Sequence, residues 1–319
     1  MKVPLLDLRP PLEELHDEIV KAVTQVIDST CYIMGPEIDG LEKEISAYCG
    51  TNDAVGVSSG TDALLLALMV LDVGPGDLVL TSDFSFFATA GVIARLNSTP
   101  VFVDIDPQTF NIDPESLRNT LTEMDAQTRK RVKAIIPVHL YGQCADMEAI
   151  LNISREYNIP VIEDGAQAIG AECELDGQKK RAGSTGDFGC FSFFPSKNLG
   201  GVGDGGIVTV NNPEIAEQLR LKRVHGGERK YYHRVIGGNF RLDPIQAAVI
   251  RVKLPHLNEW HKQRQENAEH YNKLFVEKDL LGKVQLPFIA HPQNLQNAHI
   301  FNQYVIKAER RDELQSYLA

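Results

Sequence analysis

Residues 191–206 read FSFFPSKNLGGVGDGG, and this stretch says most about the fold. A short aromatic run with strand character ends at Pro195, which turns the chain. Lys197 follows the turn, and the glycines after it let the backbone pass close to a flat ligand. A lysine just past a strand end, backed by aromatic side chains, can lose its proton through desolvation and attack an aldehyde. A surface lysine in a glycine loop explains the same residues equally well.

Around this stretch, short apolar runs alternate with helical patterns. The expected strands are brief and bounded by Gly, Pro, Asp or Ser, at residues 54–58, 78–81, 101–103, 134–138, 161–163, 190–193 and 207–210. Expected helices lie between many of them, at residues 62–71, 88–96, 115–121 and 147–157. This alternation predicts an α/β layered domain with a mostly parallel sheet. The short glycine-rich link between the last two strands allows part of the sheet to be antiparallel.

After residue 210 the pattern changes to longer helices. Residues 213–223 are expected to form one, and Asp243 with Pro244 begins another that Pro255 interrupts near its middle. The last 22 residues, AHIFNQYVIKAERRDELQSYLA, predict one strand and then a helix cut short. We therefore expect a large domain at residues 1–240 and a small, apparently truncated C-terminal domain at residues 241–319.

Composition excludes several classes of protein. The formal net charge of −11 argues against general binding of nucleic acids, which attract basic surfaces. The longest apolar stretch, residues 63–71, is far shorter than the roughly 20 residues of a membrane span, and the first residues do not resemble a signal peptide. Five cysteines without a CxxC pair predict buried thiols in a reducing cytoplasm rather than disulfides or a metal site.

A second candidate group is VIEDGAQAIGA, residues 161–171. Asp164 follows a buried strand, at the edge of the sheet where α/β folds build their sites. A carboxylate there can pair with a protonated pyridine nitrogen, and Gln167 can reach a ring hydroxyl or lean over the ring. A helix cap after a strand is the simpler explanation for Asp164 alone.

A third group is SSGTDALLLAL, residues 58–68. Gly60 and Thr61 open an amphipathic helix, whose free N–H groups and adjacent hydroxyl suit a phosphate. Ordinary capping by Thr61 explains the same residues. Ser192 offers a further hydroxyl, and residues 84–87 form an aromatic-rich segment. Together the three groups match the demands of pyridoxal phosphate: a phosphate anchor, a ring stack, a nitrogen partner and an amine.

The chain resembles the DegT/DnrJ/EryC1/StrS family of sugar aminotransferases, which have the fold of type I pyridoxal phosphate enzymes. Similarity extends over essentially the whole chain, in the segments PLLDL, SGTDAL, PVHLYGQCADM, IPVIEDGAQAIGA, FSFFPSKNLGGVGDGG and GGNFRLDPIQAA. The resemblance implies a large three-layer α/β/α domain with a mostly parallel seven-stranded sheet, plus a small α/β domain. It also implies a homodimer with shared active sites.

By position, Lys197 resembles the family's Schiff-base lysine and proton shuttle, and Asp164 the partner of the pyridine nitrogen. The remaining implied cofactor contacts are Gln167 to the ring oxygen, Gly60, Thr61 and Ser192 to the phosphate, Phe86 as stacking ring, and Asn239 to the phosphate of a neighbouring subunit. His139 is expected to pack near the cofactor or to orient the strand end.

Substrate class rests on the same resemblance. HGGERKYYHRVIGGNFRLD is most similar to the branch that aminates C3 of keto-sugars. This implies ping-pong transfer from L-glutamate to a UDP- or dTDP-linked 3-keto-sugar, in the synthesis of surface polysaccharide such as lipopolysaccharide or related amino-sugars. The basic segment 220–234 suits a sugar diphosphate, although a solvated helix end and loop has the same composition. Expected substrate contacts are Arg229, Tyr231 and Arg241.

Three alternatives remain at this stage. A sugar dehydratase on the same scaffold carries histidine in place of the lysine, so Lys197 opposes it. An aminotransferase of a cyclitol ketone is disfavoured only by the basic segment. A non-catalytic protein with this fold is disfavoured because the lysine, aspartate, glutamine and phosphate residues are all present.

Overall fold

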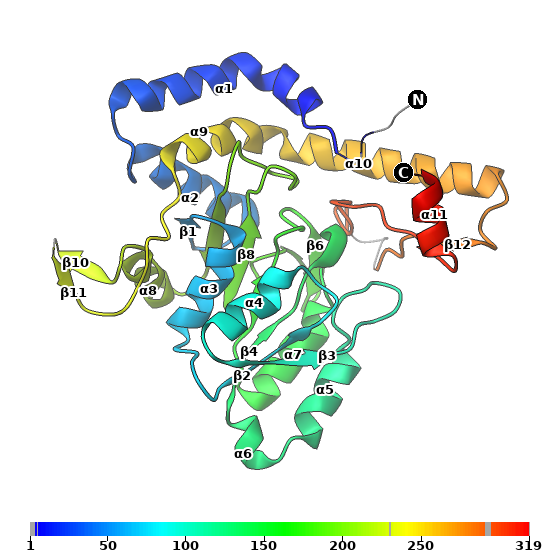
Figure 1. The fold of residues 1–319 in the computed structure, drawn as a ribbon, viewed down its shortest axis with the longest axis horizontal. Helices are drawn as coiled ribbons and strands as arrows, with labels where there is room; N and C mark the ends of the chain where they lie inside the picture. The colour runs from blue at the N-terminus through cyan, green and yellow to red at the C-terminus, as the bar shows by residue number, and fades with distance from the viewer. Residues whose placement is uncertain (1–3, 5, 230, 291–294, 319) are drawn as a thin grey trace.

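A twisted seven-stranded sheet forms the centre of the computed structural model, which describes residues 4, 6–229, 231–290 and 295–318 (Figure 1). Its strands, in chain order, are β1 (Asp53–Val57), β2 (Leu78–Ser82), β3 (Thr99–Val103), β4 (Val132–Ile136), β5 (Ile162–Asp164), β8 (Phe188–Ser192) and β9 (Gly206–Val210). Each coincides with an expected strand to within two residues, so the strand prediction is confirmed.

Strand order across the sheet is β1-β9-β8-β5 and then β4-β2-β3. Parallel bridges from Ile135 to Val161 and from Val138 to Asp164 join the two parts. β9 pairs antiparallel with both of its neighbours, whereas β5 with β8 and β2 with β3 and β4 pair parallel. The sheet is therefore mostly parallel with one reversed strand, which the glycine-rich link between β8 and β9 makes possible.

Both faces of the sheet are buried because the strands carry apolar residues at successive positions. Val55 and Val57 pack into one core cluster, whereas Ala54, the residue before Val55, packs into the other. Val79 and Leu80 divide between the clusters in the same way. Since successive side chains of a strand point to opposite faces, such strands require helices on both sides.

Helices supply those two layers. One layer contains α3 (Gly60–Val70), α4 (Phe87–Arg95) and α8 (Pro213–Arg223), and the other contains α2 (Pro36–Cys49), α5 (Pro114–Glu123) and α7 (Met147–Tyr157). This arrangement is the predicted three-layer α/β/α fold. Shorter elements in the connections between these helices and strands are α6 (Ala126–Arg129), η1 (Leu140–Gly142) and the hairpins β6 (Glu172–Leu175)–β7 (Gln178–Arg181) and β10 (Gly227–Arg229)–β11 (Tyr232–His233).

The long helices among the remaining elements cross one end of the sheet (Figure 1). They are α1 (Arg9–Ser29), α9 (Pro244–Lys253), η2 (Leu254–His256), α10 (Leu257–Glu277), β12 (Val284–Gln285), β13 (Lys307–Ala308) and α11 (Arg311–Leu318). Pro255 lies in the 3₁₀ turn between α9 and α10, as predicted, and α9 packs against α1 and α2. The domain boundary after residue 240 stays a prediction.

None of the helices in the described segments is both long and apolar enough to cross a membrane. The five cysteines are free thiols, of which Cys31 is half-buried and the others are buried.

Candidate active site

One cavity of about 330 Å³ lies where the C-terminal ends of β5 and β8 meet the first turns of α3 and α4. Seven of the eight predicted cofactor residues line it, namely Gly60, Thr61, Phe86, Asp164, Gln167, Ser192 and Lys197. They come from segments up to 137 positions apart in the sequence, and the parallel sheet brings them to one edge.

Asp164 ends β5 with a buried carboxyl group. Its Oδ2 accepts a hydrogen bond from Thr89 Oγ1 at 2.8 Å, and its Oδ1 accepts one from the Ala166 N–H at 3.2 Å. Burial raises the pKa of Asp164, while these hydrogen bonds and then the Lys197 charge oppose the rise. The carboxylate is thus held in place and partly stabilised as an anion.

Lys197 lies past the end of β8, on the same cavity. Burial lowers the pKa of its amine, and the negative charge of Asp164 works against that change. A lowered pKa increases the fraction of neutral, nucleophilic amine at a given pH. Lysine and carboxylate therefore face one cavity and interact electrostatically.

Gln167 lines the same cavity. Its Oε1 accepts a hydrogen bond from the Tyr141 backbone N–H at 2.6 Å. With the oxygen occupied in this way, the side-chain NH₂ is left to donate to a ligand oxygen. Tyr141 adopts a φ of 59°, a strained conformation for a bulky residue, and the hydrogen bond to Gln167 helps to hold it.

The start of α3 forms the polar end of the cavity. Ser59, not Thr61, is the N-cap, because Ser59 Oγ accepts from the Asp62 N–H at 3.0 Å. The suggestion that Thr61 caps the helix is therefore wrong, and its hydroxyl is not used in that way. Ser192 Oγ accepts from the Phe194 N–H at 3.3 Å, which leaves its own hydrogen available to a ligand.

Gly60 is needed for this arrangement. A Cβ atom at Gly60 would lie 2.6 Å from Ser192 Cβ, closer than any real contact. The first turn of α3 can therefore approach the end of β8 only without a side chain at this position. As a result the first turn of α3, where helix N–H groups lack partners within the helix, lines the same cavity as the side chains of Thr61 and Ser192.

Phe86 is the N-cap residue of α4 and lines the cavity, yet 73% of its surface is exposed. The stacking role implied by the resemblance stays a prediction.

The other predicted site residues lie outside this cavity. Asn239 is exposed and pairs with Val224. Arg229 and Tyr231 are exposed on the β10–β11 hairpin, which projects from the body at the left of Figure 1. Arg241 lines a neighbouring cavity that shares residues Ser59, Thr61 and Asp204 with the first. These four do not meet Lys197 within one chain, and their assigned contacts stay predictions.

The basic segment 220–234 serves largely another purpose. Arg220 donates two hydrogen bonds to Asp53 at 2.7 Å each, and Arg223 donates to Glu42 at 2.6 Å. Lys222 is buried and lies 3.7 Å from Asp72. At least four of the six cations therefore pair with carboxylates of the protein, since Arg234 also pairs with Glu228, and the composition of the segment could not reveal this. Lys230 lies outside the described residues.

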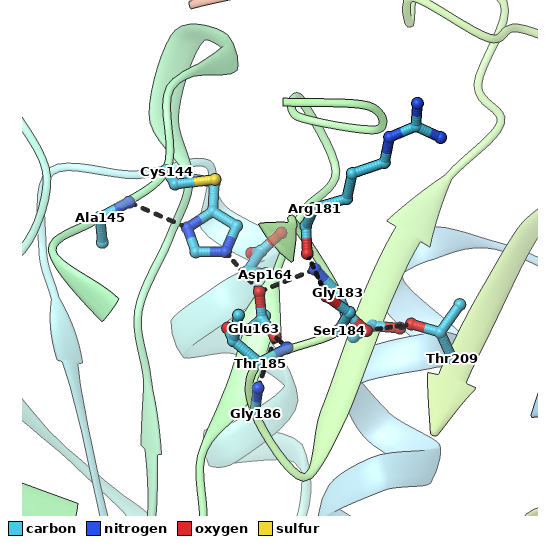
Figure 2. A network of polar contacts seen from close by, with 12 residues as sticks. Cys144, Ala145, Glu163, Asp164, Arg181, Gly183, Ser184, Thr185, Gly186 and Thr209 are labelled. Atoms are coloured by element: carbon cyan, nitrogen blue, oxygen red, sulfur yellow. Dashed lines mark hydrogen bonds and ion pairs between the residues drawn. The ribbon is translucent and has the colours of Figure 1, made fainter. Parts of the chain in front are cut away.

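A buried network beside the cavity escaped the sequence reasoning. Glu163, next to Asp164, is fully buried and accepts hydrogen bonds from the N–H groups of Gly183, Thr185 and Gly186 at 2.6–2.8 Å. Figure 2 shows the Glu163 carboxylate beside the loop formed by residues 183–186. A fourth hydrogen bond comes from His139 Nε2 at 2.9 Å.

The state of His139 follows from its contacts. Its Nδ1 accepts from the Ala145 N–H at 3.1 Å, so Nε2 carries the hydrogen and donates to Glu163. The backbone N–H of His139 donates to the Asp164 carbonyl at 3.0 Å. Although burial favours the neutral acid, the His139 hydrogen bond and the backbone donors hold the pKa of Glu163 below its usual value. His139 thus orients the strand ends, as one of the two roles expected for it.

Comparisons with known proteins agree with the fold. Residues 13–319 match the model of the DegT/DnrJ/EryC1/StrS aminotransferase family. A "pleiotropic regulatory protein" of Geobacillus stearothermophilus is 47% identical over 100% of this chain and 81% of its own length. A UDP-N-acetyl-3-dehydro-α-D-glucosamine 3-aminotransferase of Acidithiobacillus ferrooxidans is 42% identical over 99% of this chain and 80% of its own.

Solved structures are similar as well. DesV of S. venezuelae, crystallised with a ketimine intermediate, has a TM-score of 0.90 and 39% identity, over 99% of this chain and 81% of its own. The Bacillus subtilis protein NtdA, crystallised with its cofactor PMP, has a TM-score of 0.86 and 30% identity, over 98% of this chain and 68% of its own. The family match, together with relatives of this similarity, shows that the chain belongs to the DegT/DnrJ/EryC1/StrS aminotransferase family.

Proposed function

We propose that the chain is a pyridoxal phosphate-dependent aminotransferase that moves an amino group from L-glutamate to a nucleotide-linked keto-sugar. The observation that carries the proposal is that Lys197 and Asp164 line one cavity and interact electrostatically there, beside the first turn of α3. Among family members, the A. ferrooxidans relative is named for a UDP-linked 3-dehydro-sugar, and a Streptomyces venezuelae relative is named for a dTDP-linked 3-amino-sugar. These names favour a 3-keto UDP- or dTDP-sugar here.

The donors and acceptors of the cavity fit this cofactor. Thr61 and Ser192 offer hydroxyls to a phosphate beside the N–H groups of α3, and Phe86 offers an aromatic face. Gln167 offers an N–H to a ring oxygen, because its own oxygen is occupied by Tyr141. Asp164 retains acceptor capacity on Oδ1 for a protonated ring nitrogen.

When bound, pyridoxal phosphate supplies an aldehyde carbon and an electron-withdrawing ring. Lys197 provides the amine for that aldehyde. The amino donor would displace Lys197 from that carbon, and the freed Nζ would move a proton from the α-carbon of the donor to the former aldehyde carbon. In the second half-reaction Nζ would carry a proton in the opposite direction, to the keto-sugar carbon. Asp164 keeps the proton on the ring nitrogen by remaining an anion. The expected kinetics are ping-pong, because donor and acceptor use the same cavity in turn.

The cofactor claim is tested by reduction with borohydride after incubation with pyridoxal phosphate. Peptide mass mapping should find the added cofactor mass on Lys197, and Lys197→Ala should carry none. Cofactor fixed to another lysine in the wild type would overturn the assignment.

The substrate claim is tested with a panel of UDP- and dTDP-linked keto-sugars and L-glutamate. Formation of an amino-sugar with release of 2-oxoglutarate is the expected result, and Lys197→Ala should abolish it. Turnover of a free cyclitol ketone without turnover of any nucleotide sugar would contradict the proposal.

We further propose that two chains share their active sites. Exposed apolar residues on and next to the β10–β11 hairpin support this proposal, since Tyr231, Tyr232 and Ile236 are 73–86% exposed. Asn239 follows the hairpin, is exposed and lies outside its own chain's cavity, which supports a role in a neighbour's phosphate site.

A further inference from the structure

Thr89 makes a contact that no motif indicated. It lies in the first turn of α4, is 1% exposed, and donates from Oγ1 to Asp164 Oδ2 at 2.8 Å. The two residues are 75 positions apart, and the fold of the sheet brings them together. A buried hydroxyl aimed at a carboxylate that faces the cavity acts on that carboxylate directly.

A second hydroxyl extends this contact. Ser85 Oγ lies 2.9 Å from Thr89 Oγ1, and Ser85 lines the cavity. An ionised carboxylate only accepts, so Thr89 must give its one hydrogen to Asp164. Ser85 must then donate to Thr89. The hydrogen bonds run in one direction, from Ser85 through Thr89 to Asp164.

The polarity of this chain determines its electrostatic effect. Burial raises the pKa of Asp164, and the Thr89 hydrogen bond is the largest influence in the opposite direction, ahead of the Ala166 N–H and the Lys197 charge. A donor to the charged form stabilises that form. Without the Thr89 hydroxyl, the effect of burial on the pKa of Asp164 would be less opposed. The carboxyl group would then be protonated more readily.

Geometry adds a second effect. Thr89 donates to Oδ2, whereas Oδ1 accepts a hydrogen bond from the Ala166 N–H at 3.2 Å. The two oxygens are therefore not equivalent, and the carboxylate plane is fixed from both sides. Because Phe86 caps the same helix turn, one helix start supplies both the cavity-lining ring and the hydroxyl behind the carboxylate.

We propose that Thr89 is a positioning residue, which holds the Asp164 carboxylate ionised and oriented toward the ring nitrogen of the cofactor. This inference rests on the proposed function, because it assumes that pyridoxal phosphate binds in this cavity. Thr89 touches neither reacting atom and acts only through Asp164.

The test compares Thr89→Val, which keeps the shape and removes the hydroxyl, with Thr89→Ser, which keeps the hydroxyl. For each variant the dissociation constant is measured for pyridoxal phosphate and for its 1-deaza analogue, in which carbon replaces the ring nitrogen. Thr89→Val should weaken binding of pyridoxal phosphate roughly tenfold, as expected for lost support of a charged group. Binding of the analogue should not change, and Thr89→Ser should bind both ligands like the wild type.

Other outcomes overturn the inference. An equal loss for both ligands in Thr89→Val means that the hydroxyl supports packing, and no loss for either means that Asp164 does not need it. Thr89→Ala provides the same comparison if the valine variant does not fold, and thermal unfolding of the apo forms shows how far each variant is destabilised. Failure of the wild type to bind pyridoxal phosphate at Lys197 would refute the proposed function itself, which the borohydride experiment detects separately.

Discussion

Two ionisable residues that line the cavity have pKa values shifted in opposite directions. Burial lowers the pKa of Lys197 and raises that of Asp164, since both shifts favour the neutral form. Each charge opposes the shift of the other. The reactive amine is therefore easier to deprotonate than a surface lysine, whereas Asp164 depends on its hydrogen-bond donors to stay ionised.

Behind Asp164, Glu163 should be essential for stability. Glu163→Gln keeps the shape but places an NH₂ group where one carboxylate oxygen accepts two hydrogen bonds. His139 cannot adapt, because its Nδ1 already accepts from Ala145. We expect a loss of about 1–3 kcal/mol per unsatisfied buried donor in the free energy of unfolding, measured with urea.

Glu148→Gln, at an exposed position in the first turn of α7, is the control and should unfold like the wild type. Equal stability of the Glu163→Gln variant would show that the loop at residues 183–186 satisfies its N–H groups in another way.

At the scale of elements, ion pairs connect helix α8 to α2 and β1, so we expect the arginines of α8 to stabilise the fold rather than to bind substrate. Arg223 and Glu42 are about 5% exposed, and Arg220 reaches the same carboxylate at 3.4 Å. Glu42→Ala leaves a buried cation without its partner. We expect the free energy of unfolding to fall by about 3–5 kcal/mol. In protein that still folds, the KM for the sugar should be nearly unchanged.

Glu217→Ala, on the exposed side of α8, controls for the loss of a carboxylate and should be neutral. A large rise in the KM for the sugar in the Glu42→Ala variant, with normal stability, would indicate that these arginines bind the substrate.

Helix α10 contains a histidine that should make stability depend on pH. His261 is fully buried, and burial lowers its pKa from 6.5 to about 3. The folded protein therefore keeps this ring neutral, while the unfolded chain takes up a proton below pH 6.5. Stability contributed by the neutral ring is lost as the pH falls from about 6.5 toward 3 and returns as the pH rises.

His261→Leu should reduce the slope of unfolding free energy against pH in that window by about 1.4 kcal/mol per pH unit. Urea titrations at several pH values measure the slope. His270→Leu, at an exposed position of the same helix, should keep the slope of the wild type. Identical slopes in both variants would contradict the assignment.

For the whole molecule, shared sites predict complementation between two defective chains. Lys197→Ala lacks the amine, and Asn239→Ala lacks the residue proposed to serve the neighbour. In a hybrid dimer, one site combines Lys197 of the Asn239→Ala chain with Asn239 of the Lys197→Ala chain, and the other site lacks both residues. Refolded equal mixtures should recover about one quarter of wild-type activity, because half of the dimers are hybrid with one intact site.

The two variants measured separately set the baseline for that mixture. Activity equal to the sum of the separate proteins would show that each chain completes its own site, even if the protein is a dimer.

The sequence by itself determined the seven strands, most helices and the groups around Lys197, Asp164 and Gly60. These features depend on local patterns, in which strand ends, glycines and polar residues stand close together along the chain. It could not reveal Thr89, the network of Glu163, or the ion pairs of Arg220 and Arg223. Each of those side chains is ordinary in its own segment and finds its partner only after folding. Tertiary structure alone decided them, because a contact across 20 to 181 positions depends on the order of strands in the sheet and leaves no local signal.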